Sequence, residues 1–427
     1  MKELHQQTAT ALLEALSSRR VSAQQVAESC LAQIDACEAR VQAWHYLDRD
    51  QVMARARRLD AGENHGPLHG IPIGFKDIID TADMPTEYGT PIHRGHRPRI
   101  DAACVALARR AGANVFGKTV TTEFANRFPG KTTNPFDASR TPGGSSSGSA
   151  AAVGACMVPL AVGTQTTSST IRPASFCGGV GFRPTHGEMR VQGVMEASAS
   201  LDTLGLMARS VDDIALLRDV LLGLAPQALA ARDLRGLRVG LPGQSILDQC
   251  DASTQQSLDD CARALSKSGA HVSEVDLPPE FELLDDAHRW ISSFEFARNR
   301  AWEIDHHWNA ISETLRENRI HDGLTCSIET YQQARRLVER CRLQLDATFA
   351  GYDVFQIPAA AGEAPVGLSS TGNAAFCTTW SAVHVPALSL PLCKGPHGLP
   401  VGVQYVAARG EDRTLLAAAK SIMQVFA

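Results

Sequence analysis

The chain has 427 residues, of which 44% are hydrophobic, 20% charged and 6% aromatic, and its formal net charge is −5. This composition is typical of a globular protein and excludes disorder, collagen-like repeats and coiled coils as the main content. Neither charge sign gathers in long blocks, so the chain lacks the basic stripe of nucleic-acid-binding proteins. No stretch reaches the roughly 18 consecutive apolar residues of a membrane span, and residues 1–20 lack the continuous apolar segment of a secretory signal.

The cysteines indicate a reducing compartment. The chain has 11 of them, an odd number, and none forms a Cys-x-x-Cys pair. A disulfide framework or a zinc cluster needs paired spacings, which this sequence does not offer. We therefore expect free thiols, no metal site and a cytoplasmic protein.

The N-terminal part of the chain is expected to be helical. Thr8 and Ser22 are suited to cap two helices within residues 8–60, because apolar residues follow each of them at helical spacing. The third expected helix, over 51–59, is rich in arginine and is expected to be exposed.

Strand and helix patterns alternate in the rest of the chain. The apolar run 67–75 indicates a strand that ends at Lys76. Further short apolar runs indicate strands at 114–117, 237–241, 271–275, 353–357 and 387–390. Helical periodicity indicates helices at 102–111, 257–269, 284–316 and 328–349. This alternation predicts an α/β fold with a mixed, partly parallel central sheet and helices on both faces. No repeat or linker divides the sequence, so we expect one large domain over 1–427, with N-terminal helices over 1–60.

Lys76 is the first candidate for chemistry, because it directly follows the apolar run Gly70-Ile-Pro-Ile-Gly-Phe75. A lysine in this position either extends its amino group to solvent or stays buried with a lowered pKa. For an isolated lysine the exposed arrangement is the more common one, and the sequence context alone leaves both open.

Two segments rich in hydroxyl residues are the other candidates: Thr141-Pro-Gly-Gly-Ser-Ser-Ser-Gly-Ser149 and Gly163-Thr-Gln-Thr-Thr-Ser-Ser-Thr-Ile-Arg-Pro-Ala174. Each taken alone could be a flexible linker or an ordinary polar turn. Both are framed by apolar sequence, however, and the first lacks the Gly-Lys-Ser/Thr ending of a Walker phosphate loop. The co-occurrence of a lysine and two such segments favours a catalytic site.

The lysine and the two hydroxyl-rich segments together could form the active site of a nucleophilic hydrolase that has no catalytic histidine. A serine hydroxyl needs a base within hydrogen-bonding reach, and a desolvated lysine can serve as that base, directly or through a second serine. Backbone N–H groups beside the nucleophile would stabilise the oxyanion. None of the 14 histidines lies in a Gly-x-Ser-x-Gly or His-Glu-x-x-His motif, and His186 and His384 are expected to be structural.

The chain resembles the amidase signature family over nearly its whole length, most specifically over 65–205. The matching segments are Gly70-Ile-Pro-Ile-Gly-Phe-Lys-Asp77, Gly117-Lys-Thr119, Glu123-Phe-Ala125, Asn134-Pro135, Arg140-Thr-Pro-Gly-Gly-Ser-Ser-Ser-Gly-Ser-Ala-Ala-Ala152, Gly163-Thr-Gln-Thr166, Ser169, Arg172-Pro-Ala174, Phe176-Cys-Gly178, Gly181-Phe-Arg-Pro184 and Gly398-Leu-Pro-Val-Gly-Val-Gln404. The resemblance implies the amidase signature fold and cleavage of an amide bond.

The resemblance also implies a role for each site residue. Lys76 would be the base, and Ser145, on a cis peptide, would be the serine that passes the proton. Ser169, which lies 24 residues after Ser145, would be the nucleophile. The backbone N–H groups of residues 166–168, namely Thr166, Thr167 and Ser168, would form the oxyanion hole.

Within the family, the chain is most similar to the bacterial malonamidases, on the segment Lys76-Asp-Ile-Ile-Asp-Thr-Ala-Asp-Met-Pro-Thr-Glu87, on Gly163-Thr-Gln165 and on total length. That similarity implies that Arg172 holds a substrate carboxylate, as in malonamate, since a guanidinium matches a carboxylate well. Gln165 is expected to bind the substrate as well. The alternative is that Arg172 pairs with an acid inside the protein.

The sequence departs from the family pattern at the nucleophile loop. Thr167 and Ser168 stand where two glycines are usual, and a β-branched residue would be strained by about 1–3 kcal/mol if the position required a positive φ. Ser168 is also a rival nucleophile, although spacing favours Ser169. His384 stands where glycine is common, which is expected to reshape the pocket.

The sequence thus predicts an amidohydrolase that forms an acyl-serine intermediate on a small amide, without metal or organic cofactor, and that binds neither nucleic acid nor a membrane. A homodimer is what the resemblance suggests. Two alternatives stay open: the glutaminase-type subunit of a tRNA-dependent amidotransferase, and an impaired family member that acts as a binding protein.

Overall fold

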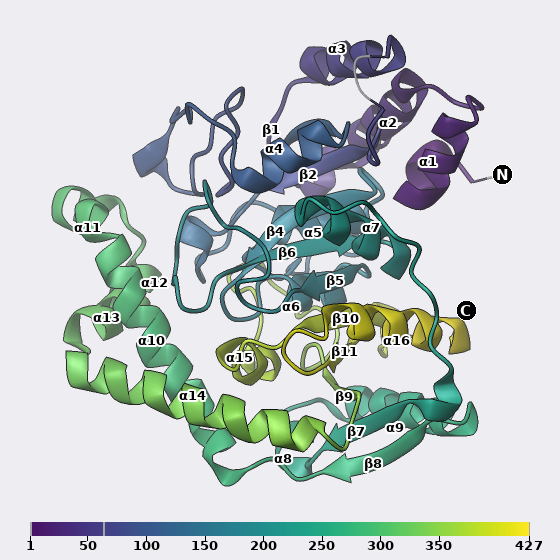
Figure 1. Ribbon diagram of the computed structural model, residues 1–427. Helices are drawn as coiled ribbons and strands as arrows, with labels where there is room; N and C mark the ends of the chain where they lie inside the picture. The colour runs from purple at the N-terminus through teal and green to yellow at the C-terminus, as the bar shows by residue number, and fades with distance from the viewer. Residues whose placement is uncertain (1, 63–64, 427) are drawn as a thin grey trace.

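Eleven strands form one continuous sheet in the computed structural model, which describes residues 2–62 and 65–426. The strand order across the sheet is β1-β3-β2-β4-β6-β5-β10-β11-β9-β7-β8 (Figure 1). The strands are β1 Trp44–Leu47, β2 Pro72–Lys76, β3 Asn114–Thr119, β4 Leu160–Gln165, β5 Val180–Arg183, β6 Thr203–Ala208, β7 Arg238–Pro242, β8 His271–Val275, β9 Val354–Pro358, β10 Ala387–Lys394 and β11 Pro400–Val406.

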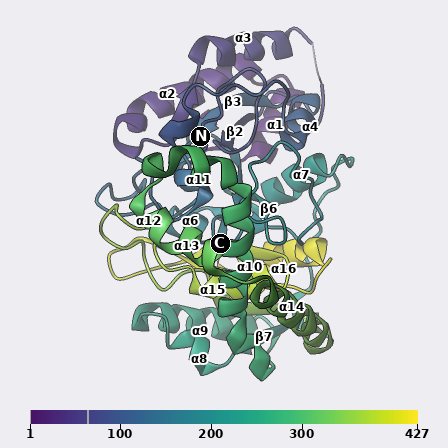
Figure 2. The same ribbon diagram turned by 90° about the vertical axis from the view of Figure 1, so that its left-hand side faces the viewer.

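Helices flank this sheet (Figures 1 and 2). They are α1 Ala9–Ser17, α2 Ala23–Val41, α3 Arg49–Asp60, α4 Ala103–Arg110, α5 Ser147–Gly154, α6 Ile171–Phe176, α7 Val211–Leu221, α8 Gln244–Leu247, α9 Ala252–Lys267, α10 Leu284–Asn299, α11 Ala301–His307, α12 Glu313–Leu315, α13 His321–Thr325, α14 Ile328–Phe349, α15 Ala375–Ala382 and α16 Asp412–Val425. The expected α/β architecture is therefore confirmed. The domain expected over 1–427 includes residues 1, 63–64 and 427, which lie outside the described residues.

The sheet is mixed, as the alternation of patterns predicts. β2 pairs in parallel with β3 on one side and with β4 on the other, and β7 pairs in parallel with β8 and β9. The remaining pairs are antiparallel. Because the carboxyl ends of parallel neighbours lie at the same edge, β2 and β4 bring the residues that follow them together. That edge carries both Lys76 and the second hydroxyl-rich segment.

The N-terminal region is not helical throughout, contrary to expectation, because β1 interrupts it. α2 ends where Gln42 takes a left-handed conformation (φ 53°), and the carboxylate of Glu38 accepts hydrogen bonds from the next two N–H groups, at 2.9 Å each. This cap turns the chain, so that Trp44 enters the sheet against β3. The pairing is a tertiary contact, which helical periodicity does not reveal.

The single helix expected over 284–316 is also broken. α10 ends at Asn299, and after α11 the chain is extended at Ile311 before a π-helical turn at Arg316–Ile320. The break has a tertiary cause, since the backbone N–H and hydroxyl of Ser312 bind the carboxylate of Glu123. The helix expected over 328–349 is confirmed as α14.

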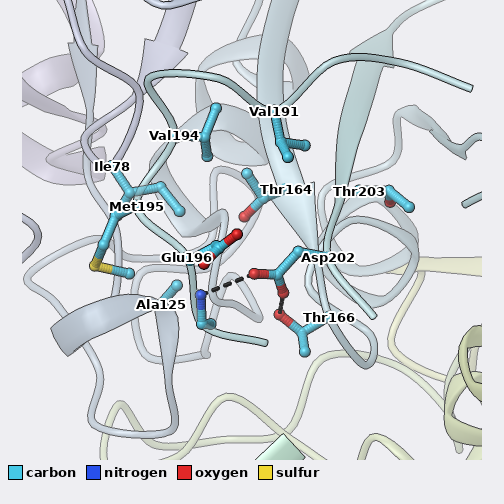
Figure 3. A pocket seen from close by; sticks show the side chains of 11 residues that line it. Ile78, Ala125, Thr164, Thr166, Val191, Val194, Met195, Glu196, Asp202 and Thr203 are labelled. Carbon is cyan, nitrogen blue, oxygen red and sulfur yellow. Dashed lines mark hydrogen bonds between the residues drawn. The ribbon is translucent and has the colours of Figure 1, made fainter. Parts of the chain in front are cut away.

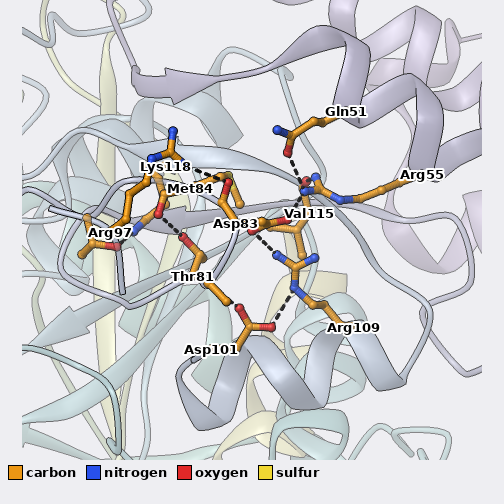
Figure 4. Close-up of polar contacts among 12 residues, drawn as sticks. Gln51, Arg55, Thr81, Asp83, Met84, Arg97, Asp101, Arg109, Val115 and Lys118 are labelled. Atoms are coloured by element: carbon orange, nitrogen blue, oxygen red, sulfur yellow. Dashed lines mark hydrogen bonds and ion pairs between the residues drawn. The ribbon is translucent and has the colours of Figure 1, made fainter. Parts of the chain in front are cut away.

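The helix expected to be exposed, α3, uses one of its arginines inside the protein. Arg55 is 9% exposed, and its guanidinium donates to the carbonyl of Val115 at 2.5 Å and to the carboxylate of Asp83. Arg109 of α4 binds the same carboxylate at 2.6 Å (Figure 4). The network therefore ties the loop after β2 to two helices, and the expectation of exposure is wrong at Arg55.

The N-terminal helix α1 is attached to the body by a buried carboxylate. Asp213 of α7 is fully buried, and its two oxygens accept hydrogen bonds from the N–H groups of Ala9 and Thr10, at 2.9 Å each. These are two of the donors that the first turn of a helix leaves without a partner. The carboxylate therefore completes α1 from a residue 204 positions beyond Ala9.

We expect Asp213→Ala to lower the free energy of unfolding by about 2–4 kcal/mol, because two helix N–H groups lose a charged acceptor. Asp212→Ala is the matched control on the same helix, since Asp212 makes a half-exposed ion pair with Lys420 and should cost at most about 1 kcal/mol. Urea unfolding of both variants measures the difference. Equal midpoints for the two would contradict this account of α1.

Candidate active site

Three polar side chains from the predicted segments form one continuous chain of hydrogen bonds. The amino nitrogen of Lys76 lies 2.7 Å from the hydroxyl of Ser145 and 2.8 Å from that of Thr164. The Ser145 hydroxyl in turn lies 2.9 Å from the hydroxyl of Ser169. The structure thus brings together the lysine and both serines that the sequence singles out, in the order in which a proton would pass.

Lys76 is completely buried, which answers the question that the sequence leaves open. Burial lowers the pKa of its amino group to about 7, and the negative charge of Asp202 opposes this shift. Its hydrogen-bond partners are hydroxyls, so no carboxylate in the described part of the chain binds its ammonium form directly. At neutral pH a large fraction of Lys76 is therefore uncharged and able to accept a proton.

Ser145 is placed by a closely packed turn before α5. The peptide bond between Gly144 and Ser145 is cis. Three residues later, Gly148 packs so tightly that a Cβ there would lie 2.3 Å from the carbonyl oxygen of Ala43 and from the nitrogen of Val120. The glycine is required at this point because any side chain would displace α5, and with it Ser145.

The loop at residues 166–169, which we call the nucleophile loop, presents backbone N–H groups that have no acceptor. Within residues 2–62 and 65–426, the N–H groups of Thr166, Thr167, Ser168 and Ser169 donate to no protein oxygen. The next two N–H groups are satisfied by the side chain of Gln165. Thr166 and Ser168 are buried, and buried backbone donors are almost always paired, so donors without an acceptor here point to a site that receives an anion or an oxyanion.

Thr167 and Ser168 do not strain this loop. Neither residue is among the described residues with positive φ, so the strain considered from the sequence does not arise. The hydroxyl of Ser168 is buried and makes no hydrogen bond to Lys76 or Ser145, whereas that of Ser169 does contact Ser145. The geometry therefore favours Ser169 over Ser168 as the nucleophile.

Gln165 has contacts other than those expected of a substrate-binding residue. Its amide oxygen accepts hydrogen bonds from the N–H groups of Thr170 and Ile171, at 2.9 and 3.1 Å, and its nitrogen donates to Ser381 at 3.2 Å. The side chain is 1% exposed. This arrangement caps the start of α6 and argues against direct contact with a substrate.

Arg172 is a buried guanidinium that forms no ion pair with a carboxylate in the part of the chain that the structure describes. One of its terminal nitrogens donates to the carbonyl of Gly144 at 2.7 Å and to the hydroxyl of Thr371 at 3.1 Å, while its Nε has no partner there. Burial lowers its pKa to about 10, so it stays charged at neutral pH. The alternative that it pairs with an internal acid does not fit these contacts.

A small cavity adjoins Thr164, the second partner of the lysine. Thr164 and Thr166 line it together with Asp202, and Met195 and Ile78 form an apolar wall (Figure 3). Asp202 accepts a hydrogen bond from the Thr166 hydroxyl at 2.5 Å and from two backbone N–H groups. This acid is therefore held next to both the lysine and the nucleophile loop.

Sequence reasoning missed three residues that support the site: Thr164, Asp202 and His288. The ring of His288, on α10, lies 3.2 Å from the carbonyl oxygen of Thr166 and is fully buried. Its segment carries no motif, so only the docking of α10 against the nucleophile loop reveals it. Thr164 and Asp202 lie within the signature core, where their polarity in a buried context was the available signal.

His384 has the contacts of a structural residue, and its backbone conformation is one that favours glycine. Its φ is 68°, in the left-handed region that glycine adopts without cost. The ring stacks on His186 with centroids 4.0 Å apart, and its Nε2 lies 2.7 Å from the carbonyl of Ser200. Burial holds the pKa of His384 far below its usual range, so the ring is neutral.

Residues 2–62 and 65–426 contain neither a membrane-spanning helix nor a metal-binding cluster of side chains. No helix in these ranges is at once long enough and apolar enough to cross a bilayer. Nor do these ranges hold a group of three or more His, Cys, Asp or Glu side chains placed to bind a metal ion.

Comparison with known proteins gives matches over nearly the full length. Residues 25–416 match the family described as Amidase. One relative is a glutamyl-tRNA(Gln) amidotransferase subunit from Chloroflexus aggregans, which is 33% identical over 97% of this chain and 96% of its own.

Solved structures agree with this result. A crystal structure of an amidase superimposes with a TM-score of 0.90 at 29% identity, covering 99% of this chain and 100% of the other. Peptide amidase from Stenotrophomonas maltophilia superimposes with a TM-score of 0.83 at 28% identity, covering 99% and 97%. None of these three proteins is named a malonamidase, so they do not support that finer assignment.

We expect the rate at which a fluorophosphonate modifies Ser169 to rise with pH and to be half-maximal near pH 7, because only neutral Lys76 accepts the proton. Asp202→Asn removes a negative charge that raises the pKa of Lys76, so the midpoint should move to lower pH. Labelling followed by mass spectrometry from about pH 5 to 9 measures both. A flat profile in the wild type would contradict the role of Lys76.

Proposed function

The chain belongs to the Amidase family and is an amide-hydrolysing enzyme, and we propose that it acts through an acyl intermediate on Ser169. The observation that carries this proposal is the hydrogen-bonded chain from Lys76 through Ser145 to Ser169, beside a loop of backbone N–H groups without acceptors. A buried base, a nucleophile and oxyanion donors are what acyl transfer needs.

The proposed reaction starts with neutral Lys76. As the oxygen of Ser169 bonds to the amide carbon, its proton passes to Ser145, and the proton of Ser145 passes to Lys76. The N–H groups of the nucleophile loop hold the resulting oxyanion. The C–N bond then breaks, and the leaving nitrogen takes the proton back along the same path. Water then attacks the ester, and its proton passes to Lys76. As the C–O bond to Ser169 breaks, Lys76 returns that proton to the oxygen of Ser169 through Ser145, and the carboxylic acid leaves.

For the substrate, we propose a short amide that carries a carboxylate, such as malonamate. Arg172 supports this choice, because its charged guanidinium is buried, has no acidic partner in the described residues and keeps its Nε unpaired. A buried unpaired cation is costly, and a substrate carboxylate would offset that cost. The hydrogen bond from Arg172 to the carbonyl of Gly144 also links it to the peptide that carries Ser145.

A second candidate is the glutaminase-type subunit of a tRNA-dependent amidotransferase. The relative from Chloroflexus aggregans favours this candidate, because it is named a glutamyl-tRNA(Gln) amidotransferase subunit and matches 97% of this chain. Release of ammonia from glutamine that occurs only with partner proteins and tRNA would support this candidate over a small-amide hydrolase. Hydrolysis of malonamate by the free protein would support the first.

We further propose that the protein is a catalytically competent, cytoplasmic homodimer. An impaired binding protein is disfavoured by the unstrained nucleophile loop and the intact hydrogen-bonded chain. The cytoplasmic location is supported by eleven cysteines that form no disulfide. The homodimer is what the resemblance suggests.

We expect Ser169→Ala to abolish amide hydrolysis, with a loss of at least about 1,000-fold in kcat, because no nucleophile remains. Ser168→Ala is the matched control and should retain activity within about threefold, since its hydroxyl contacts neither Lys76 nor Ser145. Ammonia release from a panel of small amides measures both. If Ser168→Ala were inactive and Ser169→Ala active, the assignment of the nucleophile would be reversed.

We expect Arg172→Ala to lower the preference for malonamate over a neutral amide of equal size by about 100-fold, as loss of charged hydrogen bonds predicts. The ratio of the two kcat/KM values is the readout, because removal of Arg172 also releases Gly144 and should slow both substrates. Thr371→Val is a control variant, since it removes another contact of the guanidinium but keeps its charge. An unchanged ratio in Arg172→Ala would exclude the carboxylate role.

A further inference from the structure

The nucleophile loop is held from outside through its carbonyl groups. The Nε2 of His288, on α10, lies 3.2 Å from the carbonyl oxygen of Thr166. The hydroxyl of Ser381, on α15, donates to the carbonyl oxygen of Thr167 at 2.6 Å. Consecutive peptides of the loop are therefore each bound by a side chain from a different helix.

A bond to a carbonyl also fixes the N–H group of the same peptide. A trans peptide is planar, and its C=O and N–H point in opposite directions. When His288 draws the carbonyl of Thr166 toward α10, the N–H of Thr167 must point away from α10. Ser381 fixes the N–H of Ser168 in the same way. These are two of the N–H groups that lack an acceptor among the described residues.

We propose that His288 is a positioning residue for the oxyanion hole: its imidazole holds the carbonyl of Thr166 and thereby aims the N–H of Thr167 at the substrate oxygen. The inference rests on the proposed function, since it concerns the same loop. It goes beyond that proposal by giving α10, whose His288 lies 122 residues beyond Thr166, a part in the reaction.

The residue at position 167 fits this arrangement. The hydroxyl of Thr167 lies 3.4 Å from the same ring nitrogen of His288, at the outer limit of a hydrogen bond. A glycine there would offer His288 the carbonyl of the preceding residue only. The threonine thus adds a second, weaker contact between the loop and α10, and its φ is not positive, so the contact carries no backbone strain.

His288 is in a protonation state that allows it to donate a hydrogen bond to the carbonyl oxygen of Thr166. The ring is fully buried, and this desolvation lowers its pKa to about 4, so the imidazole is neutral at pH 7. A neutral imidazole carries one N–H, and a carbonyl oxygen can only accept. The contact with Thr166 therefore places that hydrogen on Nε2.

α10 is itself fixed, so it can serve as a reference for the loop. Glu295 lies two turns after His288, which places both on the same side of the helix. Its carboxylate accepts hydrogen bonds from the hydroxyls of Ser198 and Ser200, at 2.6 and 2.5 Å, and from the hydroxyl of Tyr331 on α14 at 2.8 Å. The backbone N–H of Ser198 also donates to Asp202, the carboxylate that binds the nucleophile loop.

The test compares three variants with the wild type. His288→Ala removes the donor, and His288→Gln keeps an N–H near the position of Nε2. His306→Ala is a matched control, because His306 is exposed on α11, where its ring contacts Trp302 of the same helix. The readouts are the second-order rate of modification by a fluorophosphonate, kcat and KM for the best amide of the panel, and Tm.

We expect His288→Ala to lower the labelling rate and kcat about tenfold, less than the loss of a whole oxyanion donor. KM should change less than about threefold, since ground-state binding is not affected. His288→Gln should restore most of the rate, and His306→Ala should match the wild type. If His288 had a purely structural role, His288→Ala would lower Tm, and His288→Gln would not restore kcat without also restoring Tm.

Two outcomes would overturn the inference: His288→Ala reacting as fast as the wild type, or His288→Gln as slow as His288→Ala at a wild-type Tm. If His288→Ala fails to fold, two other variants provide the test. The labelling rates of His288→Gln and of Thr167→Val are then each compared with that of the wild type. A wild-type protein that the probe does not modify would overturn the proposed function itself, which keeps the two failures apart.

Discussion

The desolvation of the amino group of Lys76 is the constraint on which the site depends. The side chain is fully buried, and its hydrogen-bond partners, Ser145 and Thr164, are neutral hydroxyls. Burial favours the uncharged amine, while the nearby charge of Asp202 favours the ammonium form, and the resulting pKa of Lys76 is about 7. A carboxylate in direct contact would keep the lysine charged and unable to act as a base, so the distance between the two groups sets the pH range of the site.

A neighbouring lysine shows how the hydrogen-bond partners of a buried amino group determine its role. Lys118, on the adjacent strand β3, is also fully buried, but it contacts the carboxylate of Asp77 at 3.4 Å and donates to the carbonyl of Ile79 at 2.6 Å. Its partners are acceptors that stabilise an ammonium group, so it has the contacts of a structural cation. Lys76, one strand away, has hydroxyl partners and the contacts of a base.

The α/β class, the lysine and both serine segments could be predicted from the sequence, because each is a local pattern of polarity and glycine content. Prediction failed where a contact from elsewhere in the chain decides the local structure. β1 forms against β3 within a region of helical periodicity, and the 284–316 helix breaks where Ser312 binds Glu123. Arg55 is buried in a helix whose pattern indicates exposure, because acid and carbonyl partners reach it from other segments.

By itself, the sequence determined which chemical groups are present and roughly how they are spaced, since reactive side chains and glycines are encoded locally. The tertiary structure decided what those groups can do. Only the folded chain shows that Lys76 is shielded from water, that Gln165 is occupied in capping α6, and that His288 reaches the nucleophile loop. The physical reason is that desolvation and hydrogen-bond direction are properties of the environment of a residue, and that environment is assembled from segments far apart in the chain.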